Sequence, residues 1–301
     1  RWRDRVRRAG ALRHRHRQRP PQRPPRTVAP DDPASSTSYT LADPGNPPGV
    51  DCRIDNNTTN SVPVLSGPDN TWGDGTGTSK ETGCVDTLWA LQTQDKMLSA
   101  WLGRDGFNGS GGGWQARVGK DEVNAFYCPP GLSEPGYCTG TEWVRIGHNQ
   151  ANDEWLTNLD VVGHEYGHGI DQNTPPGGHS NGNTGEFVGD VFGALTEHYA
   201  NESSTYDEPD YLVGEEVNLV GDGEIRNMYN PSAKGDPNCY SSSIPNARCT
   251  RRPAPPATTG STCSPRAPTR PAVRPAPRAT TAGRSPGSAS RRPARSSTTR
   301  C

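Results

Sequence analysis

The pattern of apolar positions predicts three helices in the middle of the chain. Residues 85–102 place leucine, tryptophan and methionine side chains at roughly helical spacing, and the same period recurs over residues 158–171 and 184–200. Residues 172–183, between the last two, contain two prolines and three glycines, which are typical of a loop. We therefore expect two helices joined by an irregular segment, with a longer helix before them.

Short apolar runs elsewhere in the sequence predict strands. Residues 114–118, 124–127 and 143–147 have the length and composition of strands. Residues 39–84 are rich in threonine, asparagine, glycine and proline, which indicates short strands joined by turns, and the glycine-rich residues 103–113 predict a further turn. We expect an α+β protein with a β-rich front lobe and a helical back lobe.

Charge divides the chain into three segments. Residues 1–38 carry 11 arginines and three acidic residues, and residues 249–301 carry 11 arginines and no acidic residue. Residues 39–248 carry 10 basic and 30 acidic residues, so the net charge of −1 combines two basic ends with a strongly acidic centre. No apolar run approaches the roughly 18 residues of a membrane-spanning helix, and we expect no membrane partner.

The two basic ends, residues 1–38 and 249–301, are low-complexity sequence that cannot bury enough apolar surface to fold, so we expect disorder. One interpretation is that both ends are disordered basic segments that bind nucleic acid. They lack lysine and nearly lack aromatic residues, which argues against that partner. The second interpretation is a GC-rich gene read out of frame. A shift of one base from Cys249 to Arg270 permits an apolar segment that begins Val-His, and we favour this interpretation.

The cysteines of the central segment predict an oxidised protein. Cys128 and Cys138 bracket a short loop that a disulfide would close, and Cys52 with Cys84 is a second expected pair. Neither pair has the spacing of a thiolate zinc site. Paired cysteines and few lysines suit an oxidising, extracellular setting, so we expect a secreted protein. Because the sequence does not begin with methionine and shows no apolar signal segment, we expect a fragment or a processed product.

The clearest chemical signal is His164-Glu-Tyr-Gly-His168 in one of the predicted helices. Residues i and i+4 of a helix lie on one face, so both imidazoles can ligate one metal ion. Glu165 lies beside them, where its carboxylate can accept a proton from a metal-bound water. A polar helix with two incidental histidines would also explain these five residues taken alone.

A second pair of residues at the same spacing follows. Glu186 comes eighteen residues after His168, and Asp190 follows it at i+4 on the next predicted helix. Two histidines and one glutamate are a standard ligand set for catalytic zinc, which leaves a position open for water. Asp190 can hydrogen-bond the other nitrogen of a ligand histidine and fix its tautomer. A solvated helix face explains these acids poorly, because apolar residues surround them, so we predict a zinc site.

With these motifs the sequence resembles the thermolysin family of secreted zinc metalloendopeptidases. Residues 160–168 and 182–193 are similar to the two active-site helices of that family, and the resemblance covers about residues 50–247. It implies a two-lobe metalloprotease fold, in which an active-site helix lies between a β-rich N-terminal lobe and a helical C-terminal lobe that is truncated here. The expected divisions are a tail at 1–38, the β-rich lobe with the zinc-binding helix at 39–178, the partial helical lobe at 179–248 and a tail at 249–301.

The resemblance also implies roles for individual residues. These are zinc ligation by His164, His168 and Glu186, base catalysis by Glu165, and substrate binding by Asn124, Ala125 and Arg226. Calcium is implied as a second cofactor, with carboxylate ligands from Asp160, Glu197, Asp210 and Glu215, because hard oxygen ligands suit that ion. Leu212 stands where the family has a further acidic ligand, so a single calcium ion is expected rather than two. Ordinary surface charge is the alternative explanation of the four acids.

Departures from the family pattern bear on activity. Gly185 stands where the family has asparagine before the zinc glutamate, and the family's tyrosine is missing near Gly177, where His179 is the nearest substitute. The late histidine of the family, in a Val-His motif, stabilises the developing oxyanion. The chain has no histidine after Arg248, whereas the shifted reading frame restores Val-His at that place.

We therefore expect a secreted zinc-dependent endopeptidase that acts on protein or peptide substrates, with zinc and calcium as cofactors and impaired activity in the chain as written. A non-catalytic zinc-binding relative with basic tails is the alternative, but a purely structural zinc site needs no base such as Glu165. A basic-tailed nucleic-acid-binding protein is a third class, and the 20 excess negative charges of residues 39–248 argue against it.

Overall fold

The structure is a computed structural model that describes residues 38–43, 49–58, 61–141, 143–175 and 185–239. The secondary-structure elements below all belong to the unit that ends at Asp236. The expectations about the two tails, the loop with His179 and the sequence after Arg248 lie outside the described residues. Among the helices of the described part, none combines the length and apolarity needed to cross a bilayer.

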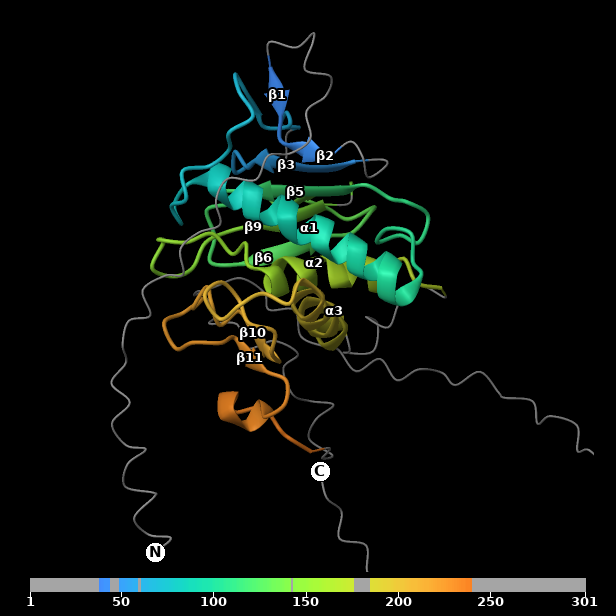
Figure 1. Ribbon diagram of the computed structural model, residues 1–301, viewed down its shortest axis with the longest axis vertical. Coiled ribbons are helices and arrows are strands. Elements are labelled where there is room, and N and C mark those ends of the chain that lie inside the picture. The colour runs from blue at the N-terminus through green and yellow to red at the C-terminus, as the bar shows by residue number, and fades with distance from the viewer. Residues whose placement is uncertain (1–37, 44–48, 59–60, 142, 176–184, 240–301) are drawn as a thin grey trace, which may run out of the picture. The chain divides into compact units, whose positions relative to one another are not determined.

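A five-stranded mixed sheet forms the centre of the β-rich part (Figure 1). Its strands, in spatial order, are β2 (Ala42–Asp43), β3 (Val50–Ile54), β5 (Trp114–Val118), β9 (Trp143–Ile146) and β6 (Ala125–Cys128). β3, β5 and β9 run parallel, and β2 and β6 are antiparallel to their neighbours. β6 is therefore an edge strand of the described sheet. The predicted strands at 114–118, 124–127 and 143–147 are confirmed within one residue.

The register of the sheet separates its two faces. Ala116 pairs with Val144 and Val118 with Ile146, and all four side chains are fully buried. Because successive side chains of a strand point to opposite faces, these residues share one face and the intervening residues share the other. The helix α1 (Lys80–Leu102) covers the first face and extends across the sheet (Figure 1).

α1 begins earlier than the apolar pattern predicts. Ser79 caps its first turn, because its hydroxyl accepts a hydrogen bond from the backbone N–H of Thr82 at 3.2 Å. The prediction placed the start at Val85, since the preceding turn is polar and carries no apolar period. α2 (Leu159–Gln172) and α3 (Gly185–Ala200) begin and end within one residue of the predicted bounds.

The remaining elements are short. They are β1 (Tyr39–Thr40), which pairs with β4 (Ser66–Gly67), the hairpin of β7 (Ser133–Glu134) and β8 (Cys138–Thr139), the pair β10 (Leu212–Val213) and β11 (Arg226–Asn227), and the 3-10 helix η2 (Pro231–Lys234). The sequence pattern did not predict these elements after Ala200. Two-residue strands are too short to show a period of two residues.

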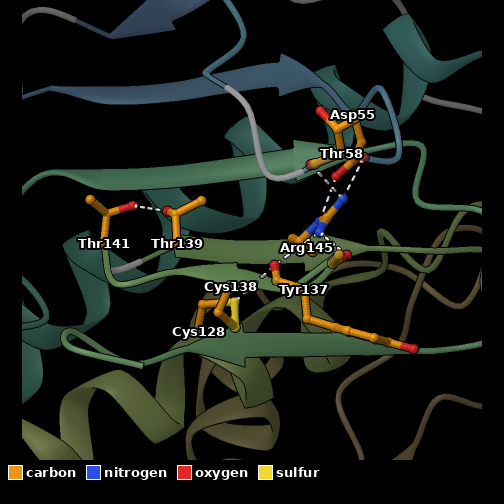
Figure 2. Close-up of a disulfide and its surroundings, with 9 residues drawn as sticks. Asp55, Thr58, Cys128, Tyr137, Cys138, Thr139, Thr141 and Arg145 are labelled. Atoms are coloured by element: carbon orange, nitrogen blue, oxygen red, sulfur yellow. Dashed lines mark hydrogen bonds and ion pairs between the residues drawn. A yellow bond between two sulfur atoms is a disulfide. The ribbon is translucent and has the colours of Figure 1, made fainter. Parts of the chain in front are cut away.

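Both expected disulfides of the central segment are present. Cys52–Cys84 joins β3 to α1, and Cys128–Cys138 closes the loop that contains β7 (Figure 2). The buried guanidinium of Arg145 holds that loop from the sheet, because it donates to the carbonyl of Tyr137 at 2.9 Å and forms an ion pair with Asp55 at 2.7 Å. The second face of the sheet is thus covered by a cross-linked loop.

Glycines allow α2 and α3 to approach closely. A Cβ added to Gly167 would lie 2.8 Å from the Cα of Gly189, and one added to Gly163 would lie 3.1 Å from the Cα of Gly193. The two glycines on each helix are four residues apart and share one face, so no side chain separates the helices there. This contact determines the distances between the functional side chains that the two helices carry.

Candidate active site

Two antiparallel rows of polar side chains face each other across the contact between α2 and α3. Asp160, His164 and His168 recur every four residues on one face of α2, and Glu186 and Asp190 lie one turn apart on α3. His164 is 5% exposed and Asp190 is 6% exposed, so both lie in the interface. These two groups are buried as partners, because Nδ1 of His164 on α2 hydrogen-bonds the Asp190 carboxylate on α3.

Three of these side chains converge on one point. The Nε2 atoms of His164 and His168 lie 3.1 Å apart, and the Glu186 carboxylate lies 3.6 Å from the first and 3.7 Å from the second. A tetrahedral zinc ion with bonds of about 2.0–2.1 Å would place its ligand atoms roughly 3.3 Å apart. The donor set and its spacing therefore fit zinc. The Glu186 side chain is 30% exposed, which leaves this point accessible to solvent.

Asp190 and Arg226 fix the orientation of His164. The Asp190 carboxylate accepts from Nδ1 of His164 at 2.8 Å and from Nη2 of Arg226 at 2.6 Å. With its proton on Nδ1, His164 presents the lone pair of Nε2 to His168 and Glu186. Burial alone would disfavour both charges, but Arg226 and His164 outweigh it and lower the pKa of Asp190, while the hydrogen bond to Asp190 raises the pKa of His164.

Burial shifts the pKa values of the other two residues of the motif in the metal-free protein. Burial, with the adjacent charge of His164, lowers the pKa of His168 to about 3, so its ring offers a free lone pair. Burial raises the pKa of Glu165 to about 7. A carboxyl group with this pKa gains and releases a proton near neutral pH, which is the property required of a general base.

The edge strand β6 lies beside this cluster. The backbone N–H of Tyr127 donates to the Glu165 carboxylate, and a Cβ added to Gly169 of α2 would lie 3.0 Å from the ring of Tyr127. Asn124 and Ala125 precede Tyr127 at the start of the same strand, and both are half-buried. An extended peptide can add to such an edge by main-chain hydrogen bonds.

A cluster of five carboxylates lies at the other end of the helix pair. Glu197 lies within 4.8 Å of Asp160 and Asp207 on one side, and of Asp210 and Glu215 on the other, measured between potential ligand oxygens. Burial raises the pKa of Asp160 to about 6, that of Asp207 to about 8 and that of Glu215 to about 9, and it raises the pKa of Glu197 furthest. Buried carboxylates without cationic partners fit a hard cation such as calcium.

One cavity has no part in either cluster. It measures about 440 Å³ and is lined by residues that include Lys80, His148 and Trp155. None of its lining residues belongs to the zinc or the carboxylate group. The convergence of ligands, and not the volume of a cavity, therefore marks the candidate site.

Comparison with known proteins agrees with this geometry. The family model for the thermolysin metallopeptidase catalytic domain matches residues 27–172, and the model for the thermolysin metallopeptidase alpha-helical domain matches residues 179–251. The chain belongs to the thermolysin metallopeptidase family. Both domains of the family are represented, which confirms the expected fold class of a two-lobe metalloprotease.

Individual relatives in the family are distant. A transglutaminase-activating metalloprotease from Streptomyces mobaraensis is 29% identical over 206 residues, which cover 67% of this chain and 25% of that protein. A thermolysin from Alicyclobacillus acidocaldarius is 29% identical over 185 residues, which cover 58% of this chain and 31% of the relative. The protealysin precursor from Serratia proteamaculans superimposes with a TM-score of 0.44 and 17% identity over 65% of this chain and 55% of that one. The chain spans about a quarter to a third of the two curated relatives.

Sequence reasoning missed two parts of this arrangement. It gave Arg226 only a contact with a substrate carbonyl, which stays a prediction, and it did not anticipate that the Arg226 guanidinium binds Asp190. It also omitted Asp207 from the acidic cluster. Asp207 belongs to no recognisable motif, so only the folded chain reveals its place beside Glu197.

Proposed function

We propose that the protein is a zinc-dependent endopeptidase that hydrolyses peptide bonds in protein or peptide substrates. The observation that carries the proposal is the convergence of His164, His168 and Glu186 on one point beside the buried carboxylate of Glu165. Family membership supports the same reaction. The lobe divisions proposed with it are 39–178 for the β-rich lobe and 179–248 for the helical lobe.

His164, His168 and Glu186 would hold zinc, which when bound lowers the pKa of a water ligand and polarises the scissile carbonyl. Glu165 would act as general base, taking a proton on its carboxylate and later delivering it to the leaving amine. Burial favours this step, since a carboxylate with a raised pKa is a stronger base. Asp190 would keep the Nδ1 proton on His164 and so preserve the metal-binding tautomer.

The substrate would bind in extended form along the free edge of β6. Asn124 and Ala125 would contact its backbone at the start of this strand, near Glu165. Arg226 would contact a substrate carbonyl through the part of its guanidinium that Asp190 does not occupy. The two disulfides support a secreted protein, because such bonds persist in oxidising compartments.

Calcium is the second proposed cofactor, held by Asp160, Glu197, Asp210 and Glu215. Both carboxylate oxygens of Glu197 are buried without a hydrogen-bond partner. An unpaired buried carboxylate is unfavourable, and a divalent cation would remove that penalty. The proposed role is structural, because these ligands join α2 and α3 to the segment that contains β10.

A non-catalytic zinc-binding relative is the second candidate. Residues 199–301 contain no histidine, whereas the family resemblance expects an oxyanion-stabilising histidine in that part of the chain. Impaired turnover with intact zinc binding would follow from this difference. The two candidates therefore differ in activity and agree in metal content.

Hydrolysis of an internally quenched peptide, together with zinc content by mass spectrometry, tests the proposal on the full chain. Glu165→Gln is expected to keep one zinc ion and lose about 10²- to 10⁴-fold in kcat. The matched control Glu134→Gln changes an exposed glutamate and is expected to keep both properties. Zinc binding with no difference in hydrolysis between the parent chain and Glu165→Gln would favour the non-catalytic relative, and absence of zinc binding would refute both candidates.

A further inference from the structure

The edge strand β6, along which the proposed substrate would bind, has hydrogen-bonded support on one side only. Its four residues pair with β9 alone among the described strands. A short strand with one neighbour opens easily, because few backbone hydrogen bonds must break. The backbone N–H of Tyr127 in this strand nevertheless donates to the Glu165 carboxylate, and this contact requires β6 to hold its place. The further support that β6 needs must come from its two faces.

Each face of β6 packs against a different part of the chain. Tyr127 lies on the first face of the sheet, where its ring is beside Gly169 of α2. Phe126 and Cys128 lie on the second face, because successive side chains of a strand alternate. The ring of Phe126 lies 5.5 Å from the ring of Tyr137, measured between the ring centroids. α2 thus supports one face of β6, and the loop that contains Tyr137 supports the other.

This loop, residues 128–138, has a small core and a covalent closure. Cys128, Cys138 and Trp143 form a buried cluster that is separate from the main core. The backbone N–H of Gly140 donates to the carbonyl of Leu132 at 2.7 Å, which closes the loop further. Cys128 is the last residue of β6, and the chain that follows Cys138 leads into β9. The disulfide therefore ties the end of β6 to the segment before its only described neighbour.

Arg145 fastens the loop to the second face of the sheet (Figure 2). Its buried guanidinium donates from Nη1 to the carbonyls of Gly136 at 2.8 Å and Tyr137 at 2.9 Å. The ion pair with Asp55 at 2.7 Å compensates its charge, and removal of either partner would leave a buried charge unpaired. Because Arg145 pairs with Phe126 in the sheet, the loop is held beside the middle of β6.

We propose that the loop 128–138 and its disulfide are a positioning element for β6. The loop keeps this strand where it can pair with an extended peptide and where Tyr127 reaches Glu165. The Cys52–Cys84 disulfide has no such role, because it joins β3 to α1. The proposal rests on the proposed function and deepens it. Since the proposed zinc ligands belong to α2 and α3, loss of the loop is expected to weaken peptide binding and to leave zinc bound.

Hydrolysis of two internally quenched peptides by the full chain tests this role. One peptide is short, and the other carries the same central sequence with additional residues on both sides. The parent chain is expected to prefer the longer peptide, because an added strand gains main-chain hydrogen bonds along β6. In the double variant Cys128→Ser/Cys138→Ser, kcat/KM for the longer peptide is expected to fall about 10- to 100-fold, mainly through KM, with the preference for length lost and the zinc content unchanged.

The matched control is the double variant Cys52→Ser/Cys84→Ser. It removes a disulfide that spans 32 residues rather than 10, so it is expected to lose more stability than the first double variant. It is nevertheless expected to retain the preference for the longer peptide. Loss of that preference in both double variants, or its retention in Cys128→Ser/Cys138→Ser, would overturn the proposal, and so would a parent chain that shows no preference for length.

Two substitutions of Tyr137 test the loop with its disulfide intact. Tyr137→Ala removes the ring that lies beside Phe126 and is expected to lose part of the preference for the longer peptide. Tyr137→Phe keeps that ring and is expected to behave like the parent chain. Equal behaviour of Tyr137→Ala and Tyr137→Phe would contradict a role of the loop in holding β6.

Hydrogen exchange measured by mass spectrometry adds a readout that needs no activity. Exchange in residues 125–128 is expected to be faster in Cys128→Ser/Cys138→Ser than in the parent chain, whereas exchange in residues 159–172 is expected to be unchanged. Unchanged exchange in residues 125–128 would overturn the positioning role. Absence of hydrolysis in every form, together with faster exchange in β6, would instead refute the proposed function and with it the role of the loop in substrate binding.

Discussion

Replacing Gly189 by alanine tests whether the close contact between α2 and α3 positions the metal ligands. The added Cβ would lie 2.6 Å from both Cε1 and Nδ1 of His164. Non-bonded carbon atoms prefer separations of about 3.5–4.0 Å, so the ring or the helix must move by roughly 1 Å. Rotation of the ring would break its 2.8 Å hydrogen bond to Asp190, and separation of the helices would move Glu186 away from His168.

The expected loss of stability is modest. Overpacking of this kind costs about 1–3 kcal/mol, whereas alanine is favoured over glycine inside a helix by about 1 kcal/mol. The free energy of unfolding is therefore expected to fall by about 0–2 kcal/mol. The loss of zinc affinity is expected to be larger, about 10- to 100-fold, because the ligand is displaced while the fold is retained.

Gly193→Ala is the matched comparison, one turn further along the same helix. Its Cβ would lie 2.5 Å from the backbone carbonyl oxygen of Asp160, which cannot rotate away as a side chain can. We expect Gly193→Ala to lose more free energy of unfolding than Gly189→Ala. For each kcal/mol of unfolding free energy lost, we expect its zinc affinity to decrease less. Urea unfolding of the zinc-free proteins and competition with a chromophoric chelator give the two quantities. If Gly189→Ala retains both the stability and the zinc affinity of the parent, the proposed contact is wrong.

Three further outcomes are expected. Removing the Cys52–Cys84 disulfide, which spans 32 residues, is expected to lower the free energy of unfolding by about 3.7 kcal/mol from chain entropy, measurable by urea titration of the double alanine variant. Asp190→Asn is expected to weaken zinc binding about 10- to 100-fold in a chelator competition assay, with the helical circular dichroism unchanged. Burial raises the pKa of Asp207 to about 8 and that of Glu215 to about 9. Between these values and the lower pKa of the unfolded chain, the calcium-free folded protein binds protons that the unfolded chain has released. The thermal midpoint of the calcium-free protein is therefore expected to fall as pH rises from about 4 to 9. A calcium-free midpoint that rises over this interval would contradict these shifts, and saturating calcium is expected to reduce the fall.

The sequence predicts the elements whose apolar period is long and regular. α2 and α3 are found within one residue of their predicted ends, because each has one face of small and apolar side chains and another of polar ones. The first turn of α1 escapes prediction because its stabilising contact is a polar cap at Ser79. β10 and β11 escape because a strand of two residues is specified by its partner and not by its own pattern.

The candidate site is predictable to the extent that it is local. His164, Glu165 and His168 share one helical turn, so their common location follows from helix geometry alone. The residue type of Glu186 indicates that it can complete a zinc ligand set with the histidines. Its approach to them in space depends on the glycine contact between α2 and α3, which the sequence pattern does not specify. Asp207 lies outside any local pattern, since its place depends on the turn that begins at Ser203.

The two ends of the α2–α3 pair are mechanically connected. Asp160 and His164 are four residues apart on one helix, a rise of about 6 Å, so a cation held by Asp160 and a zinc ion held by His164 constrain the same helical turn. On the facing helix α3, Glu197 would hold the cation and Glu186 the zinc ion, so both ions would also constrain that helix. Cation binding at the carboxylates would therefore reduce the freedom of the helices to separate at the proposed zinc ligands, because both contacts would resist the same motion. The carboxylate repulsion that opposes the fold without calcium would act on this interface first, so zinc affinity is expected to decrease when calcium is removed.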